Sequence, residues 1–200
     1  MKVEFLYDFG SPNAYLAHRV LPQIEARRGV KFRYVPILLG GVFKLTNNKS
    51  PVVQFAGIKN KLAYERLEID RFIRKHGLIQ FHMNPNFPVN TLTIMRGAVA
   101  AAKDGVAAPY IEAMFHAMWE DGRKLDDVAV VIATLKEAGL DGDRIAGQTQ
   151  EQAIKDELVS NTENAVARGT FGAPTFFVDD QIFFGKDRLR DVEEAISAAQ

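Results

Sequence analysis

The sequence contains no cysteine among its 200 residues. A disulfide, a thiolate metal site, an iron–sulfur cluster and a cysteine nucleophile are therefore excluded. Any thiol chemistry carried out by this chain requires a thiol that arrives with a ligand.

An excess of charge of one sign and long apolar runs are also lacking. Lys and Arg together number 25, as do Asp and Glu, so no global field favours nucleic acid or an anionic membrane as a partner. No apolar run approaches the length of a membrane span, and the N-terminus has no long apolar segment typical of a signal peptide. The four histidines show no metal-ligand spacing. We therefore expect a soluble, cytoplasmic protein without a metal site.

What is present is a pattern of short strands and many helices. Hydrophobic residues make up 47% of the chain, which is enough for a sizeable core. Residues 2–8 and 30–38 are predicted to be strands around a helix over 12–27, which Pro22 is expected to weaken or bend. A strand, a helix and a parallel strand form one βαβ unit with a right-handed crossover.

The middle of the chain differs from both ends, because residues 55–168 show helical periodicity almost throughout. Strand character returns at Thr175–Val178 and Gln181–Phe184, around an acidic pair that predicts a hairpin. A last helix begins near Lys186. An apolar stripe within the helical block is predicted to belong to the core: Tyr110, Met114, Phe115, Met118 and Trp119. The alternative is that one or two of these side chains line an aromatic substrate pocket.

The loop after the first strand, Asp8-Phe9-Gly10-Ser11-Pro12, carries the most specific local pattern. Ser followed by Pro is a favoured pair at the start of a helix, so one interpretation of Ser11 is a helix cap. A hydroxyl at a helix N-terminus also stabilises a thiolate. The two roles are compatible because a hydroxyl accepts one hydrogen bond and donates another.

The order βαβ…ββα, with Pro174 at the start of the third strand, is similar to the thioredoxin fold. The fold class is therefore expected to be α/β and thioredoxin-like, with a helical domain inserted between the second and third strands, as in DsbA and the kappa-class glutathione transferases. We expect residues 1–40 and 170–200 to form the thioredoxin-like domain and residues 41–169 the inserted domain. Bacterial disulfide oxidoreductases open the first helix with Cys-Pro-x-Cys. Here the segment is Ser11-Pro12-Asn13-Ala14, which excludes dithiol redox chemistry.

Four blocks in register resemble the 2-hydroxychromene-2-carboxylate isomerase family, whose sister group is the kappa-class glutathione transferases. They are Asp8-Phe9-x-Ser11-Pro12 with Tyr15, residues 38–51, residues 84–91, and "GTFGAPTFFV" with "FFGKDRL" near the C-terminus. The resemblance implies a homodimeric, glutathione-dependent isomerase of a small aromatic carboxylate. Its reaction opens the hydroxychromene ring to trans-o-hydroxybenzylidenepyruvate in aromatic hydrocarbon catabolism.

The resemblance also implies roles for individual residues at the glutathione site. Ser11 is the expected catalytic residue and holds the thiolate, while Ala173, followed by a cis Pro174, pairs with the glutathione backbone. The turn at residues 186–188 is expected to hold the γ-glutamyl end, with three candidates: Lys186, Asp187 and Arg188. An alternative for Asp187 is that it caps the last helix.

Three further residues are assigned to the ligands in the same way. Lys44 and Asn48 are expected in a polar loop, with Lys44 facing the substrate carboxylate and Asn48 contacting glutathione or substrate. Asn86 is expected against the substrate, at a position where the isomerase usually has an aromatic hydroxyl. Two other functions remain open: a kappa-type transferase that keeps the glutathione adduct as its product, and a non-catalytic thioredoxin-fold binding module.

Overall fold

Four short strands form one mixed sheet in the computed structural model, which describes residues 1–200. Their order is β2-β1-β3-β4, with bounds Val3–Tyr7 for β1, Arg33–Pro36 for β2, Thr175–Val178 for β3 and Gln181–Phe184 for β4. β1 and β2 are parallel, and β3 is antiparallel to both of its neighbours. The predicted βαβ unit and the hairpin are confirmed.

Helices make up most of the remaining chain, and eight of them, α2 to α9, lie between β2 and β3. None of the helices combines the length and the hydropathy that crossing a bilayer requires. Their bounds are α1 (Pro12–Arg28), α2 (Leu39–Thr46), α3 (Pro51–Phe55), α4 (Lys61–His76), α5 (Leu92–Lys103), α6 (Ala107–Trp119), α7 (Val128–Glu137), α8 (Gly142–Gln148), α9 (Gln152–Ala167) and α10 (Leu189–Ala198).

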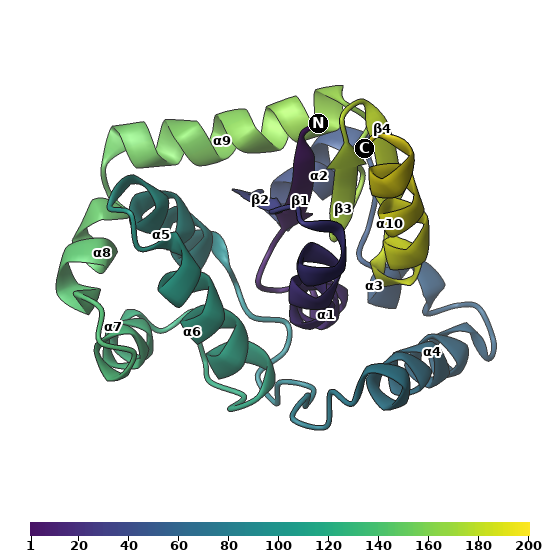
Figure 1. Cartoon of the computed structure of the whole chain (residues 1–200). Coiled ribbons are helices and arrows are strands. Elements are labelled where there is room, and N and C mark those ends of the chain that lie inside the picture. Colours follow the sequence, from purple (N-terminus) through teal and green to yellow (C-terminus); the bar gives the residue numbers. More distant parts are fainter.

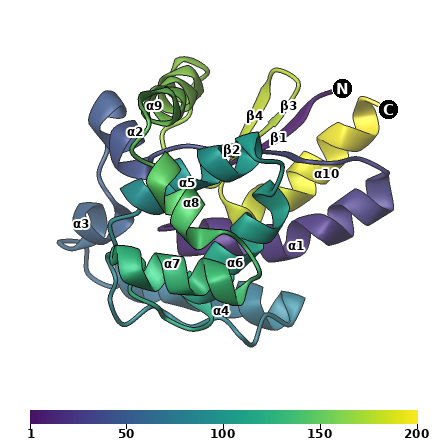
Figure 2. The ribbon, with the colours of Figure 1, turned by 90° about the vertical axis from the view of Figure 1, so that its left-hand side faces the viewer.

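The two faces of the sheet are covered by different helices because side chains alternate along a strand. Phe5 and Tyr7 of β1 point into the larger core cluster, with residues of α1, α6 and α10. Leu6 points the other way, into a smaller cluster with Phe177 and residues of α2 and α9. Figure 1 shows α9 crossing one end of the sheet and α5 to α8 gathered to one side. In both views the two termini lie close together (Figures 1 and 2).

The predicted apolar stripe of α6 is confirmed as core, since all five of its side chains are buried. Phe115 packs against Tyr7 and Phe9. Trp119 donates its indole N–H to the carbonyl of Phe9 at 2.8 Å. The stripe therefore supports the loop that leads into α1.

Three assignments differ from the expectation. β2 begins at Arg33 rather than at Val30, because the N–H of Phe32 donates to the Glu25 carboxylate and not to a strand. Lys44 lies in a helix and not in a loop, because α2 spans Leu39–Thr46, whereas Asn48 follows that helix. The last helix begins at Leu189, after a 3-10 turn over 186–188. The predicted helix over 12–27 is confirmed as α1, which contains Pro22.

Candidate active site

Ser11 lies at the N-cap of α1, where the chain is extended before the first helical turn. Its hydroxyl oxygen accepts a hydrogen bond from the N–H of Ala14 at 3.2 Å, so the capping role is confirmed. The same hydroxyl donates to the carbonyl oxygen of Ala173 at 2.9 Å. The side chain is 5% exposed, and its only proton is therefore held by the segment that contains Pro174.

The peptide bond between Ala173 and Pro174 is cis, as predicted. The carbonyl of Pro174 accepts from the N–H of Gly185 at 3.0 Å, and Thr175 Oγ1 donates to the carbonyl of Gly172 at 2.8 Å. The N–H of Ala173 makes no hydrogen bond within the chain. One backbone donor thus stays available beside Ser11.

Asn48 contacts the same segment from the other side of the site. Its side-chain N–H donates to the carbonyl of Phe171 at 2.9 Å. The ring of Phe171 packs against Phe184, with 4.5 Å between the ring centroids. The Phe184 ring in turn lies so close to Gly172 that a Cβ at that position would be 2.8 Å from it. Asn48 therefore positions the chain that leads into Ala173.

The sequence pattern predicts no role for Asp8, although this residue belongs to the motif that contains Ser11. Its carboxylate is 1% exposed and accepts from the N–H of Gly10 at 2.8 Å and from the N–H of Leu39 at 2.7 Å. The Thr91 side chain lies beside the same turn, next to Gly10. Burial raises the pKa of Asp8 from its ordinary value, and these hydrogen bonds oppose that shift. The sequence feature that could have identified Asp8 as a site residue is its position directly after a predicted strand.

The turn at residues 186–188 follows β4, but its three side chains differ in exposure. Lys186 is 3% exposed, and its ammonium group bonds both carboxylate oxygens of Asp187 at 2.7 and 2.9 Å. The ammonium group also lies 5.0 Å from the centroid of the Phe72 ring. Asp187 does not cap α10, because the N-cap position belongs to Arg188 and no side chain bonds there. Asp187 and Arg188 both keep exposed side chains.

Lys44 and Asn86, the two residues assigned to the substrate, have different surroundings. Lys44 is exposed in the last turn of α2 and has no acidic partner. The amide nitrogen of Asn86 donates to Asn84 Oδ1 at 3.2 Å and to the carbonyl of Gly122 at 3.0 Å. Both donors of Asn86 are therefore used within the protein, and only its carbonyl oxygen is left for a ligand.

Polar contacts join α1 to the helical block. The Tyr15 hydroxyl donates to Glu120 at 2.8 Å. His18 lies between the Tyr34 hydroxyl at 2.9 Å and Glu112 at 3.0 Å. The hydrogen bond with His18, together with the nearby guanidinium of Arg19, lowers the pKa of Glu112 to about 2. These contacts hold the first helix against the helical block.

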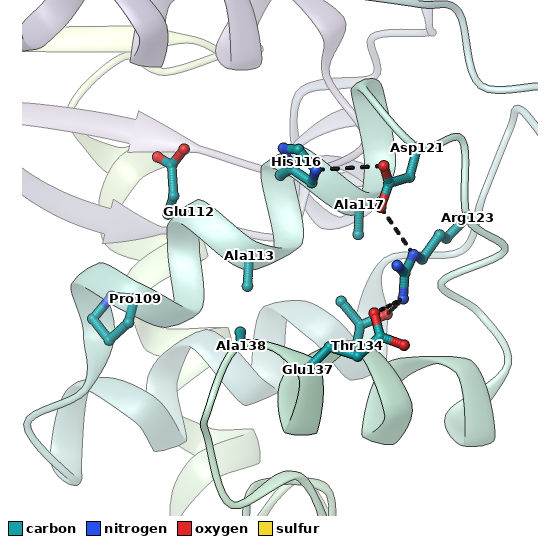
Figure 3. Close-up of a pocket in the computed structure, with 10 residues that line it drawn as sticks. All are labelled: Pro109, Glu112, Ala113, His116, Ala117, Asp121, Arg123, Thr134, Glu137 and Ala138. Atoms are coloured by element: carbon teal, nitrogen blue, oxygen red, sulfur yellow. Dashed lines mark hydrogen bonds and ion pairs between the residues drawn. The ribbon is translucent and has the colours of Figure 1, made fainter.

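A hollow of about 440 Å³ lies between α6 and α7 and contains none of the predicted site residues (Figure 3). The guanidinium of Arg123 bridges Asp121 at 3.0 Å and Glu137 at 2.7 Å. His116 also faces Asp121, at 3.4 Å. The charged groups around the hollow are thus largely paired with one another, and we place the candidate active site at Ser11 instead.

The groups around Ser11 suit an anionic, extended ligand. The N-terminus of a 17-residue helix attracts negative charge, and a hydroxyl and a free backbone N–H lie next to it. The chain itself supplies no thiol. The arrangement can therefore hold a ligand's thiolate, but it cannot exchange a disulfide.

Comparisons with known proteins give the family and the fold of this chain. A family model described as "DSBA-like thioredoxin domain" matches residues 2–197. A 2-hydroxychromene-2-carboxylate isomerase from Pseudomonas putida is 28% identical over 197 residues, which cover 98% of this chain and 94% of that protein. Glutathione S-transferase kappa 1 from Caenorhabditis elegans is 20% identical, over 100% of this chain and 92% of that protein.

A solved structure of selenomethionine-containing 2-hydroxychromene-2-carboxylate isomerase has a similar backbone. Its TM-score is 0.85 at 28% identity, and the match covers 100% of this chain and 96% of that one. The fold class predicted from the sequence is therefore confirmed.

Proposed function

This chain belongs to the DSBA-like thioredoxin domain family, and we propose that within this family it is a glutathione-dependent isomerase of the 2-hydroxychromene-2-carboxylate type. Its reaction opens the substrate ring to trans-o-hydroxybenzylidenepyruvate in the breakdown of aromatic hydrocarbons. The observation that carries the proposal is the 2.9 Å hydrogen bond from the Ser11 hydroxyl to the Ala173 carbonyl. It brings together two segments, 162 residues apart, that were assigned to glutathione separately. Full-length similarity to an isomerase from Pseudomonas putida supports the same function.

The residues present fit glutathione. The free N–H of Ala173 suits the carbonyl of the cysteinyl residue, and the Ala173 carbonyl suits its N–H, as when a peptide adds to a strand. If that N–H replaces the Ser11 hydroxyl at the Ala173 carbonyl, the Ser11 proton becomes available for the thiolate. The exposed side chains of Asp187 and Arg188 suit the ammonium and carboxylate groups of the γ-glutamyl end. Lys186, which is buried, holds Asp187 in place.

When bound, glutathione supplies a thiolate that adds reversibly to the conjugated ring system and lets the former double bond rotate. A free thiol has a pKa of about 8.5, so a predominant thiolate at pH 7 requires about 2.7 kcal/mol of stabilisation. The N-terminus of α1 contributes about 0.3–1 kcal/mol, rising to ~2 in a partly buried site. The Ser11 hydroxyl contributes about 1.5–3 kcal/mol as a donor to a charged group. Together they reach the required amount.

The chain's other residues orient the substrate in this proposal. Lys44 has no acidic partner, and its ammonium group binds the substrate carboxylate. Asn48 holds the Phe171 carbonyl and so keeps the glutathione-binding segment in place. Asn86 is left with one acceptor, its carbonyl oxygen, for a substrate hydroxyl.

The organisation of the site is part of the same proposal. Residues 1–40 and 170–200 form the thioredoxin-like domain that supplies Ser11, and residues 41–169 form the inserted domain that supplies Lys44. The protein acts in the cytoplasm as a homodimer. Support for an interface comes from α3, which has no buried residue and leaves Val52 and Val53 more than half exposed. Analytical ultracentrifugation tests the dimer.

Ultraviolet spectra of 2-hydroxychromene-2-carboxylate, recorded with the protein and with or without glutathione, test the function. We expect the substrate spectrum to change only when glutathione is present, with no net consumption of glutathione. S-methylglutathione has no ionisable thiol and should bind without supporting the reaction. Stoichiometric loss of glutathione would instead identify the kappa-type transferase. No binding of glutathione at millimolar concentration would identify the binding module.

A further inference from the structure

Asp8 lies where three segments of the chain meet. Its carboxylate accepts from the N–H of Gly10, which precedes Ser11, and from the N–H of Leu39, which begins α2. Thr91, at the N-cap position of α5, packs beside Gly10. We call the carboxylate with its two backbone donors the Asp8 clamp. Each segment also carries or adjoins a residue of the proposed site, namely Ser11, Lys44 and Asn86. The clamp therefore lies where the parts of the site meet.

The clamp leaves little freedom around Ser11. The N–H of Ser11 donates to the backbone carbonyl of Asp8 at 3.0 Å, which closes the turn. A Cβ added to Gly10 would be 3.1 Å from the Thr91 methyl group and 3.4 Å from Asp8 Oδ1. The turn is thus packed directly against the start of α5, and a shift of the start of α2 relative to the turn must break the hydrogen bond from Leu39 to Asp8.

α2 has few other contacts that fix its distance from Ser11. Val42 is its one buried side chain. One further hydrogen bond at its start runs from the N–H of Leu38 to Thr162 Oγ1, at 3.0 Å, and leads to α9 rather than to the Ser11 turn. The backbone also links the N–H of Ile37, two residues before α2, to the carbonyl of Tyr7 at 3.1 Å. Within α2 itself, the bond from the N–H of Leu39 to Asp8 Oδ2, at 2.7 Å, is the hydrogen bond that joins the helix bearing Lys44 to the loop bearing Ser11.

We propose that Asp8 is a positioning residue that sets the distance between the thiol-binding group, Ser11, and the substrate-binding group, Lys44. This inference rests on the proposed function. Only a carboxylate suits the position, because it accepts through both oxygens. An asparagine would present one amide N–H group to a backbone N–H and would lose one of the two bonds at 2.8 and 2.7 Å.

Leu39→Pro is the sharpest test, because it removes the N–H that α2 donates to Asp8 together with the leucine side chain, whose packing a second variant measures separately. Leu39 is the first residue of α2, a position that favours proline. Leu38 before it is extended, with φ −93° and ψ 109°, as a residue preceding proline prefers. Leu39→Ala keeps the N–H and trims the side chain, so it measures the loss of packing alone. Asp8→Asn removes the acceptor.

We expect Leu39→Pro and Asp8→Asn to raise the KM for the hydroxychromene carboxylate at least about tenfold relative to Leu39→Ala. The pKa of the bound glutathione thiol, read from thiolate absorbance across pH, should not change in Leu39→Pro. A role limited to overall stability would lower the melting temperature and leave the KM of the folded fraction unchanged. Equal KM values in the two Leu39 variants would overturn the inference, as would a changed thiol pKa with an unchanged KM in Asp8→Asn.

A second measurement does not depend on activity. Because the chain has no cysteine, spin labels can be attached at Gln23→Cys on α1 and Leu45→Cys on α2, both exposed positions. We expect the distribution of label distances to broaden or shift in Leu39→Pro and Asp8→Asn relative to Leu39→Ala. An unchanged distribution would overturn the inference even if the chain is an isomerase. A wild-type protein without glutathione-dependent activity would overturn the proposed function alone.

Discussion

The loop from Asp8 to Ser11 is held by side-chain hydrogen bonds to other parts of the chain. The helices α2 and α3, by contrast, together bury a single side chain, Val42. Asp8 is 1% exposed and Ser11 5% exposed, and each makes side-chain hydrogen bonds to distant backbone groups. Residues 51–60, by contrast, are almost wholly exposed. In the proposed enzyme, the part that holds the thiolate is therefore preorganised, and the part that receives the substrate is loosely packed. Preorganisation matters most where charge must be stabilised.

The largest effect is expected for Ser11→Ala, which removes the preorganised donor. The pKa of the bound thiol should rise by about one to two units from about 6.5, so the thiolate fraction and with it kcat/KM at pH 7 should fall about 3- to 25-fold. Because a higher pKa requires a higher pH for the thiolate, the activity profile should move to alkaline pH and recover part of the rate there. Turnover measured across pH, with denaturant unfolding alongside, tests this.

Ser11→Thr is the matched control, since it keeps the hydroxyl. Loss of the cap by itself should cost about 0.5–2 kcal/mol of stability. If Ser11→Ala is less stable but equally fast at pH 7, with an unshifted profile, Ser11 is only a cap and the proposed mechanism is wrong.

A smaller effect is expected for Asn48→Ala, which removes the hydrogen bond between the segment after α2 and the segment that leads into Ala173. Loss of one neutral hydrogen bond to the Phe171 carbonyl costs about 0.5–1.5 kcal/mol, so the Kd for glutathione should rise about two- to tenfold. Asn48→Gln keeps the amide and should lose less. Calorimetric titration with glutathione measures both variants, and equal Kd values in Asn48→Ala and the wild type would remove Asn48 from the site.

Lys44→Gln tests the loosely packed part directly. An exposed ion pair contributes up to about 1 kcal/mol, so the KM for the carboxylate substrate should rise about fivefold while glutathione affinity stays the same. Lys49→Gln is the matched control, because Lys49 is also exposed and lies five residues along the chain. The effect of Lys44→Gln should shrink in high salt. Equal KM values in the two variants would contradict the role of Lys44.

The smallest effect concerns the contact that holds α1 against α6. Bonding to His18 lowers the pKa of Glu112 to about 2 in the folded state, and the unfolded value lies near 4.5. The folded state therefore gains stability above pH 4.5, and the gain is lost as the pH falls toward 2. Glu112→Gln should flatten this part of the curve of stability against pH. Because Glu112 is half exposed, the change should be modest. Unfolding measured from pH 6 to pH 2 tests it.

Several features follow from the sequence because they depend on neighbouring residues. The period of apolar residues predicts the strands and the helical block, and Ser11-Pro12 predicts the helix start. The absence of cysteine excludes dithiol chemistry regardless of fold. Local signals also misplace some boundaries. Val30 was assigned to a strand, but the Glu25 carboxylate takes the N–H of Phe32 and delays pairing until Arg33.

The partners of polar side chains were decided only by the tertiary structure. Lysine is usually exposed at the protein surface. Lys186 is nevertheless buried, with its ammonium group near the Phe72 ring and bonded to Asp187. Both amide donors of Asn86 are used by its own loop and by Gly122. Asp8 finds backbone donors at residues 10 and 39. The physical reason is that a buried polar group must be satisfied by whatever donors and acceptors the packed chain brings to it. Residues distant in the sequence supply most of these groups.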